Sequence, residues 1–218
     1  MQHVTPLLML IWPATLFPSQ KDVPAEAVRP VTIYTQFAHP PAVVSIEEMK
    51  IELDAIMVPL DLQFDWRSLE QASGREASAE LVVVSFKGEC QSEWRPQQLQ
   101  KGPLGWTHMA DGAILPFADV DCDRIRDLMT HSLAMAVPPE RARMLGRAMA
   151  RVLAHELYHF LMNTTRHSSS GIAKASYTAA ELTCPYLRFD DAHLRLPGQE
   201  KVHPPGGKTR GTAVQYGK

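Results

Sequence analysis

Residues 155–159 of the chain read His-Glu-Leu-Tyr-His, so a glutamate follows the first of two histidines that are four positions apart. Residues four apart lie on the same side of an α-helix, one turn apart, and both imidazoles can therefore bind one metal ion. The glutamate can hold a water molecule beside that ion instead of binding the ion itself. The pattern predicts Zn2+ bound by His155 and His159, with Glu156 as the general base of a hydrolase.

A long helical pattern positions these three residues. Pro138-Pro139-Glu140 is typical of a helix start, because proline is tolerated in the first turn and an acid is favoured near the positive end of the helix dipole. Apolar residues then recur at spacings of three and four up to the two histidines. We predict a largely buried helix over 139–162, about 36 Å long, which gives the histidines a rigid support.

A zinc hydrolase needs a third protein ligand. Asn163 tolerates the left-handed conformation that ends a helix, and residues 168–171 (Ser-Ser-Ser-Gly) predict a tight polar turn. A chain that reverses at Asn163 can bring His167 back to the two histidines, so we choose His167 as the third ligand. Glu181, in an expected short helix over 178–183, is the alternative and would give a His-His-Glu site. Should neither bind, the remaining candidates are two carboxylates: Asp190 and Asp191.

In this region the chain resembles the metzincin-like zinc peptidases, whose signature is H-E-x-x-H-x-x-G-x-x-H followed by a turn that contains methionine. Three residues match that signature: His155, Glu156 and His159. Met162 replaces the glycine, Thr165 replaces the third histidine, His167 comes two residues later, and residues 171–174 contain no methionine. Residues 155–174 are more similar to a group of small bacterial predicted secreted peptidases. The resemblance implies a zincin-like fold and hydrolysis of peptide bonds.

The resemblance also implies where a substrate binds. In zinc peptidases of this kind, a sheet edge beside the active-site helix holds the peptide as an added strand, and residues 105–108 are the candidate edge here. His108 is then either an ordinary surface histidine, the interpretation we favour, or a group near the metal that polarises a carbonyl. Tyr177 or Tyr186 could supply a hydrogen bond to the oxyanion.

We therefore expect a zinc metallopeptidase that acts on a peptide or protein substrate. Two alternatives stay open: a catalytically silent, zinc-stabilised binding module, and a zinc hydrolase of a non-peptide amide. An intact Glu156 favours an enzyme over the binding module, because structural zinc needs no base.

The composition is that of an ordinary globular protein, 45% hydrophobic and 21% charged with a formal net charge of −2. It gives no sign of binding to nucleic acid or to an anionic membrane, and no pattern sets an oligomeric state. Four arginines recur along the expected long helix, and we interpret them as its solvated face: Arg141, Arg143, Arg147 and Arg151.

The first residues predict export. The apolar run Leu7–Trp12 is too short to cross a bilayer and is typical of a secretory signal. We expect residues 1–27 to be a signal segment, cut at Ala25-Glu26-Ala27 or near Ser19. Residues 28–196 then form the zincin-like catalytic domain, and 197–218 a disordered tail. The protein would be secreted or periplasmic, with a cytoplasmic location as the alternative, and would have no stable membrane span.

The three cysteines bear on the same question. In an exported protein, Cys90 and Cys122 would form a disulfide that closes a loop of about 30 residues, whereas two buried free thiols are the alternative. Cys184 stands apart, and no cysteine has a partner at the spacing of a zinc finger.

The other segments complete an α+β fold, in which a mixed twisted β-sheet packs on the long active-site helix that carries HExxH. We expect strands over 31–38 and 60–66, and a central strand over 81–86. Segments 105–108 and 113–117 predict a hairpin around Asp111-Gly112. A helix would run from a capping box at Ser45 and Glu48 to about Val58, and short helices would lie near Ala179 and over 190–196.

Overall fold

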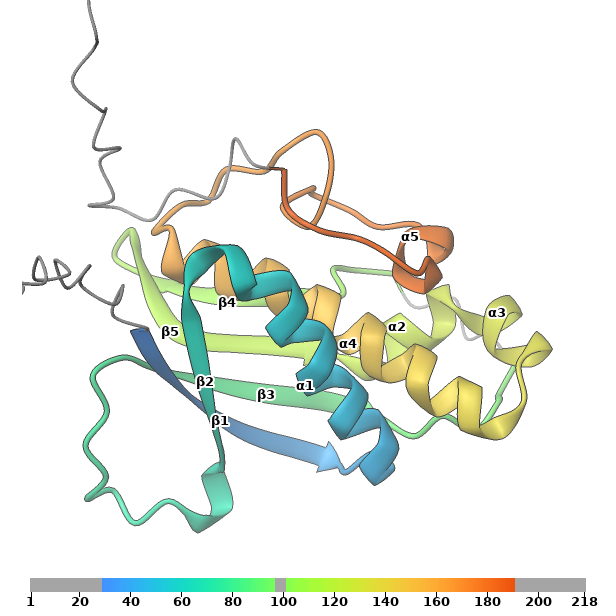
Figure 1. The fold of residues 1–218 in the computed structure, drawn as a ribbon, viewed down its shortest axis with the longest axis horizontal. Coiled ribbons are helices and arrows are strands. Elements are labelled where there is room, and N and C mark those ends of the chain that lie inside the picture. The colour runs from blue at the N-terminus through green and yellow to red at the C-terminus, as the bar shows by residue number, and fades with distance from the viewer. Residues whose placement is uncertain (1–28, 97–100, 191–218) are drawn as a thin grey trace, which may run out of the picture.

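The computed structural model describes residues 29–96 and 101–190 (Figure 1). The expected signal segment 1–27, the tail 197–218 and both domain boundaries lie outside the described residues, as do Asp191 and nearly all of the expected helix over 190–196. Within the described ranges, no helix combines the length and the apolar character that a bilayer crossing requires.

Five strands form one mixed sheet in the order β2-β1-β3-β5-β4. Four of them are parallel: β1 (Arg29–His39), β2 (Leu62–Ser68), β3 (Leu81–Glu89) and β5 (Ala113–Asp121). The fifth, β4 (Gly105–Ala110), pairs antiparallel with β5 at one edge. The expected α+β class with a mixed sheet and a central strand at 81–86 is confirmed.

A tight hairpin joins β4 to β5. Asp111 and Gly112 both have positive φ values, 50° and 77°, as a two-residue turn that matches the twist of the strands requires. The expected hairpin is therefore present, and β4 is an edge strand of the sheet, as expected for residues 105–108.

Two helices cover one face of the sheet. Helix α1 (Val43–Met57) packs along α4 (Pro138–Leu161), which also contacts β4 and β5, and Figure 1 shows both helices in front of the strands. Gly146 permits the close approach of the helices, because a Cβ there would lie 2.4 Å from the Ser45 carbonyl oxygen. The bounds of α4 differ from the expected 139–162 by one residue at each end. Large apolar side chains from both helices are fully buried in the core between the helices and the sheet: Met49, Leu53, Ile56, Leu145 and Met149.

The expected start of α1 is wrong. The helix begins at Val43 with Ala42 as its N-cap, and Ser45 and Glu48 form no capping box. Both side chains bind α4 instead: the Ser45 hydroxyl donates to the Ala142 carbonyl oxygen at 2.9 Å, and Glu48 pairs with Arg147 at 3.0 Å. The expected strand over 60–66 also starts later, at Leu62, because residues 58–60 form a 3₁₀ turn.

The interpretation of the four arginines as a solvated face is wrong for two of them. Arg151 is fully buried and donates from Nε to Oε1 of Glu52 on α1 at 2.9 Å. Arg147, one turn earlier on the same side of α4, pairs with Glu48 and Glu140 at 3.0 Å each. These two positions face α1, whose glutamates supply the opposite charge that burial requires.

Two helices were not expected from the sequence, α2 (Cys122–Leu128) and α3 (Thr130–Met135). Asp121 is the N-cap of α2, since its side chain accepts a hydrogen bond from the backbone N–H of Arg124.

The expected disulfide Cys90–Cys122 is present and joins the end of β3 to the start of α2, while Cys184 is a free thiol. The short helix expected near Ala179 is α5 (Ala179–Thr183).

Candidate metal centre

Three histidines converge at the C-terminal end of α4. His155 and His159 lie on its last two turns, and Asn163 has a φ of 45°, the left-handed conformation that ends the helix and reverses the chain. His167 follows in the returning loop. One ring nitrogen from each histidine lies within 4.8 Å of the other two. The helix histidines are buried and His167 is exposed, so the group is open on one side.

Backbone carbonyls fix the tautomers of the two helix histidines. Nδ1 of His155 lies 2.9 Å from the Ile172 oxygen, and Nδ1 of His159 lies 2.7 Å from the Thr164 oxygen. A carbonyl oxygen only accepts hydrogen bonds, so each Nδ1 must carry a proton. In the neutral ring, Nε2 then carries a lone pair and no proton, which is the form that binds metals.

The two Nε2 atoms lie only 3.0 Å apart. Burial lowers the pKa of His155 to about 4 and also lowers that of His159, so both rings are neutral near pH 7. Two lone pairs at this distance repel each other unless a cation lies between them. In a tetrahedral zinc site with Zn–N distances of about 2.0–2.1 Å, ligand nitrogens are about 3.3 Å apart, close to the separation found here. Three imidazoles are a donor set that suits Zn, Cu, Fe or Ni.

Glu156 lies next to this group and faces the edge strand. It is buried, and its Oε2 accepts a hydrogen bond of 2.8 Å from the Thr107 hydroxyl of β4. Gly105 permits this approach, because a Cβ there would lie 2.8 Å from a Val152 methyl carbon and 3.0 Å from Oε1 of Glu156. Burial raises the pKa of Glu156 to about 7, against the lowering effect of the Thr107 hydrogen bond.

Hydrogen bonds at Ile172 hold the loop that follows α4 in place. The Ile172 oxygen accepts hydrogen bonds from both His155 and the Tyr177 hydroxyl, and the Ile172 N–H donates to the Arg188 oxygen at 3.1 Å. Gly171 has a φ of +67°, and a Cβ there would lie 2.4 Å from the Arg188 oxygen. The segment around Arg188 therefore sets the position of the carbonyl that orients His155.

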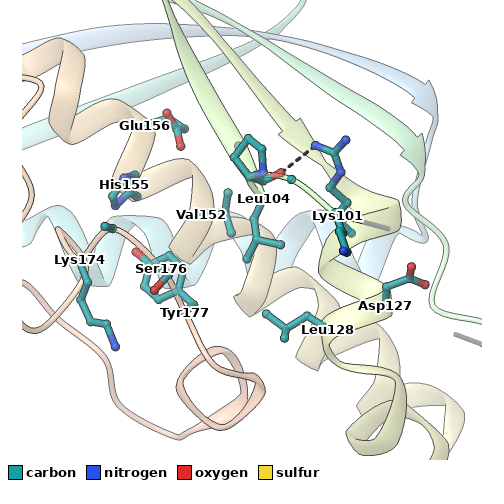
Figure 2. Close-up of a pocket in the computed structure, with 15 residues that line it drawn as sticks. Lys101, Leu104, Asp127, Leu128, Val152, His155, Glu156, Lys174, Ser176 and Tyr177 are labelled. Atoms are coloured by element: carbon teal, nitrogen blue, oxygen red, sulfur yellow. Dashed lines mark hydrogen bonds between the residues drawn. The ribbon is translucent and has the colours of Figure 1, made fainter. Parts of the chain in front are cut away.

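A cavity of about 520 Å³ opens beside His155 and Glu156 (Figure 2). The start of β4, helix α2, helix α4 and the loop at 174–177 form its walls. Of the two tyrosines expected to donate to an oxyanion, Tyr177 lines this cavity, and burial raises the pKa of its hydroxyl. Tyr186 is 72% exposed, lies outside the cavity lining, and stacks on the Arg188 guanidinium at 4.7 Å.

The alternative ligands lie elsewhere. The Glu181 carboxylate binds Lys174 and the N-cap Thr178 of α5, contacts that lower its pKa to about 2. Asp190 accepts a hydrogen bond from Ser170. His108 is 44% exposed and lies 2.9 Å from Asp119, as the favoured interpretation of a surface histidine expects. Among the described residues, only the three histidines form a group with metal-binding geometry.

Sequence reasoning missed Thr107, the Ile172 carbonyl and the wall that α2 contributes to the cavity. The first two carry no local signal in the sequence, whereas the N-cap Asp121 followed by Ile125 and Met129 at helical spacing could have revealed α2.

No protein-family model matches the chain, and a search of curated proteins found no match either.

Proposed function

We propose that the protein is a zinc-dependent peptidase in which His155, His159 and His167 bind the metal. The observation that carries this proposal is the 3.0 Å separation of the two Nε2 atoms, neither of which carries a proton when both Nδ1 atoms donate to backbone carbonyls. A pair of histidines with a purely structural role would share a proton or turn apart. The choice of zinc rests on the HExxH pattern and on the hydrolytic chemistry that it accompanies.

When bound, zinc would polarise a substrate carbonyl and lower the pKa of water to about 7. Glu156 would take a proton from the attacking water and pass it to the leaving amine. The C–N bond breaks, the water oxygen joins the acyl carbon, and the amine gains the proton. Thr107 would hold one carboxylate oxygen of Glu156, while the backbone carbonyls of Ile172 and Thr164 keep the imidazoles oriented.

Three features support a peptide as the substrate. The chain resembles metzincin-like peptidases at the HExxH residues, and the edge strand β4 lies directly beside α4. A peptide could pair with the side of β4 opposite β5, where no strand of the described ranges lies, and pass the histidine group. The cavity beside His155 is large enough for substrate side chains.

Export of the protein is part of the proposal. A disulfide between two fully buried cysteines is typical of proteins from an oxidising compartment. Together with the apolar N-terminal run in the sequence, it supports a secreted or periplasmic location over a cytoplasmic one.

The test combines metal analysis of the purified full-length chain with digestion of a peptide library. We expect one zinc per chain and cleavage by the wild type, while Glu156→Gln keeps the zinc and loses at least about 10²-fold in activity. Glu140→Gln makes the same change at a partly buried glutamate in the first turn of α4, which pairs with Arg143 and Arg147 and does not line the cavity. It serves as the control, with full activity expected.

Other outcomes would contradict the proposal in distinct ways. Stoichiometric zinc without cleavage of any peptide would favour a silent binding module or an enzyme for another amide. Full activity of Glu156→Gln would exclude the proposed base.

A further inference from the structure

The cavity beside the histidines has three parts along its length. His155 and Glu156 line one end, and Figure 2 shows Lys101 and Asp127 at the other, with Leu104, Val152 and Leu128 between them. These three apolar residues, here called the apolar zone, come from the segment before β4, from α4 and from α2. A group that enters from the histidine end therefore meets an apolar surface first and charged side chains beyond it.

Three cationic side chains line the cavity and differ in their partners: Lys101, Arg124 and Lys174. Arg124 donates to the Pro103 oxygen at 3.0 Å and pairs with Asp121 at 3.3 Å. Lys174 is bound to Glu181.

Lys101 differs from both. Its side chain is exposed, and no ion pair joins it to any residue in the described ranges. Asp127, by contrast, has a partner of its own. Lys101 is thus the cation that can bind an incoming anion without breaking an existing pair.

We propose that this cavity selects a substrate segment in which an apolar side chain is followed by a carboxylate, with Lys101 as the specificity-determining residue. The inference rests on the proposed function, since it makes the cavity the binding site for residues next to the cleaved bond. The volume of about 520 Å³ lies in the range of ligand pockets and leaves room for more than one side chain. A carboxylate bound by an ammonium group forms charge-assisted hydrogen bonds, which are about twice as strong as neutral ones.

The carboxylate could come from two sources. If it is the C-terminus of the substrate, the enzyme releases short C-terminal fragments. If it is an acidic side chain, the enzyme cleaves within longer chains near an acidic residue. The chemistry that Lys101 recognises is the same in both cases.

The test measures binding, so that it does not depend on cleavage. The full-length Glu156→Gln protein is titrated with three probes: N-acetyl-Phe-Gly with a free carboxylate, its C-terminal amide, and the amide of N-acetyl-Phe-Glu. We expect at least one carboxylate probe to bind about tenfold more tightly than the neutral amide, as a charge-assisted hydrogen bond predicts. The probe that gains affinity identifies the source of the carboxylate.

Variants of Lys101 decide whether this residue is responsible. Lys101→Ala should remove the preference, Lys101→Arg should keep it and Lys101→Glu should reverse it, with affinity for the neutral amide unchanged. Lys50→Glu, which makes the same charge change on α1 outside this cavity, should keep the wild-type preference. Equal affinities for acid and amide, or a preference that survives Lys101→Glu, would overturn the inference. Failure of the proposed function would instead appear as absent zinc or absent cleavage, whatever the probes show.

Discussion

Thr107 on the edge strand β4 donates a hydrogen bond of 2.8 Å to the Oε2 atom of Glu156 on α4. The same hydroxyl lies 3.1 Å from the backbone oxygen of Glu156. Because Glu156 is buried, a carboxylate oxygen without a donor would be costly at this position. One threonine thus connects the edge of the sheet to the orientation of the proposed base.

Thr107→Val keeps the shape of the side chain and removes its hydroxyl. We expect the free energy of unfolding to fall by about 1–3 kcal/mol, because the buried carboxylate loses its donor. We also expect kcat to fall by about tenfold to a hundredfold, because the base is no longer held in place. Urea unfolding and steady-state kinetics measure the two effects. Thr107→Ser retains a hydroxyl and should recover most of both, and wild-type kcat in Thr107→Val would show that the contact has no role in orientation.

His167→Ala and Glu181→Ala together test the third ligand. His167 lies with the two helix histidines, whereas Glu181 is bound to Lys174 and Thr178. We expect His167→Ala to lose most of its zinc affinity and Glu181→Ala to retain one zinc per chain, as measured by metal analysis after dialysis. The reverse pattern would assign a His-His-Glu site. Retention of zinc by both variants would reject both ligands.

Gly171→Ala tests the support of the loop that holds His155. A Cβ at Gly171 would collide with the Arg188 oxygen at 2.4 Å and would displace the neighbouring Ile172 carbonyl. Gly74→Ala is a matched control, because Gly74 has a similar φ of +73° and no atom lies within 4 Å of an added Cβ. Left-handed strain of about 1–2 kcal/mol should appear in both variants. Only Gly171→Ala should lose more stability than this and also lose zinc affinity, so equal losses in calorimetry and zinc titration would contradict the role of the loop.

Replacing both Cys90 and Cys122 by alanine tests the disulfide. The bond closes a loop with a sequence separation of 32, so its removal should lower the free energy of unfolding by about 3–4 kcal/mol. Cys184→Ala removes the free thiol and should lower the free energy of unfolding by less than about 1 kcal/mol.

The cellular location of the protein can be checked on native protein by mass spectrometry without reduction. An intact Met1 together with three free thiols would place the protein in the cytoplasm.

The parts of the structure that the sequence predicts well are those with a local pattern. His155 and His159 share one face of α4 because residues four apart do so in any α-helix. Asn163 was expected to end the helix because asparagine tolerates the left-handed conformation. The hairpin at Asp111-Gly112 is equally local, since two positive φ values are required within two residues. These predictions needed no knowledge of the rest of the fold.

The parts that could not be predicted depend on contacts between distant residues. Thr107 meets Glu156 across 49 residues, and the buried Arg151 pairs with Glu52, which lies 99 residues earlier in the sequence. The carbonyl that orients His155 belongs to Ile172, but a backbone oxygen is common to every residue and gives no signal in a sequence. The prediction of a capping box at Ser45 was wrong for a related reason: the side chains of Ser45 and Glu48 both bind α4 instead.

The contacts behind His155 also bear on the order in which the protein folds. Glu52 binds Arg188 across 136 residues, Arg188 accepts a hydrogen bond from Ile172, and Ile172 orients His155. The intervening chain must be brought together, at an entropic cost, before contacts between such distant residues can stabilise the fold. A chain released before residue 188 has been synthesised carries the complete HExxH sequence but lacks this support. The proposed hydrolytic activity should therefore require synthesis to have passed Arg188, and a shorter nascent or truncated chain that carries HExxH should lack it.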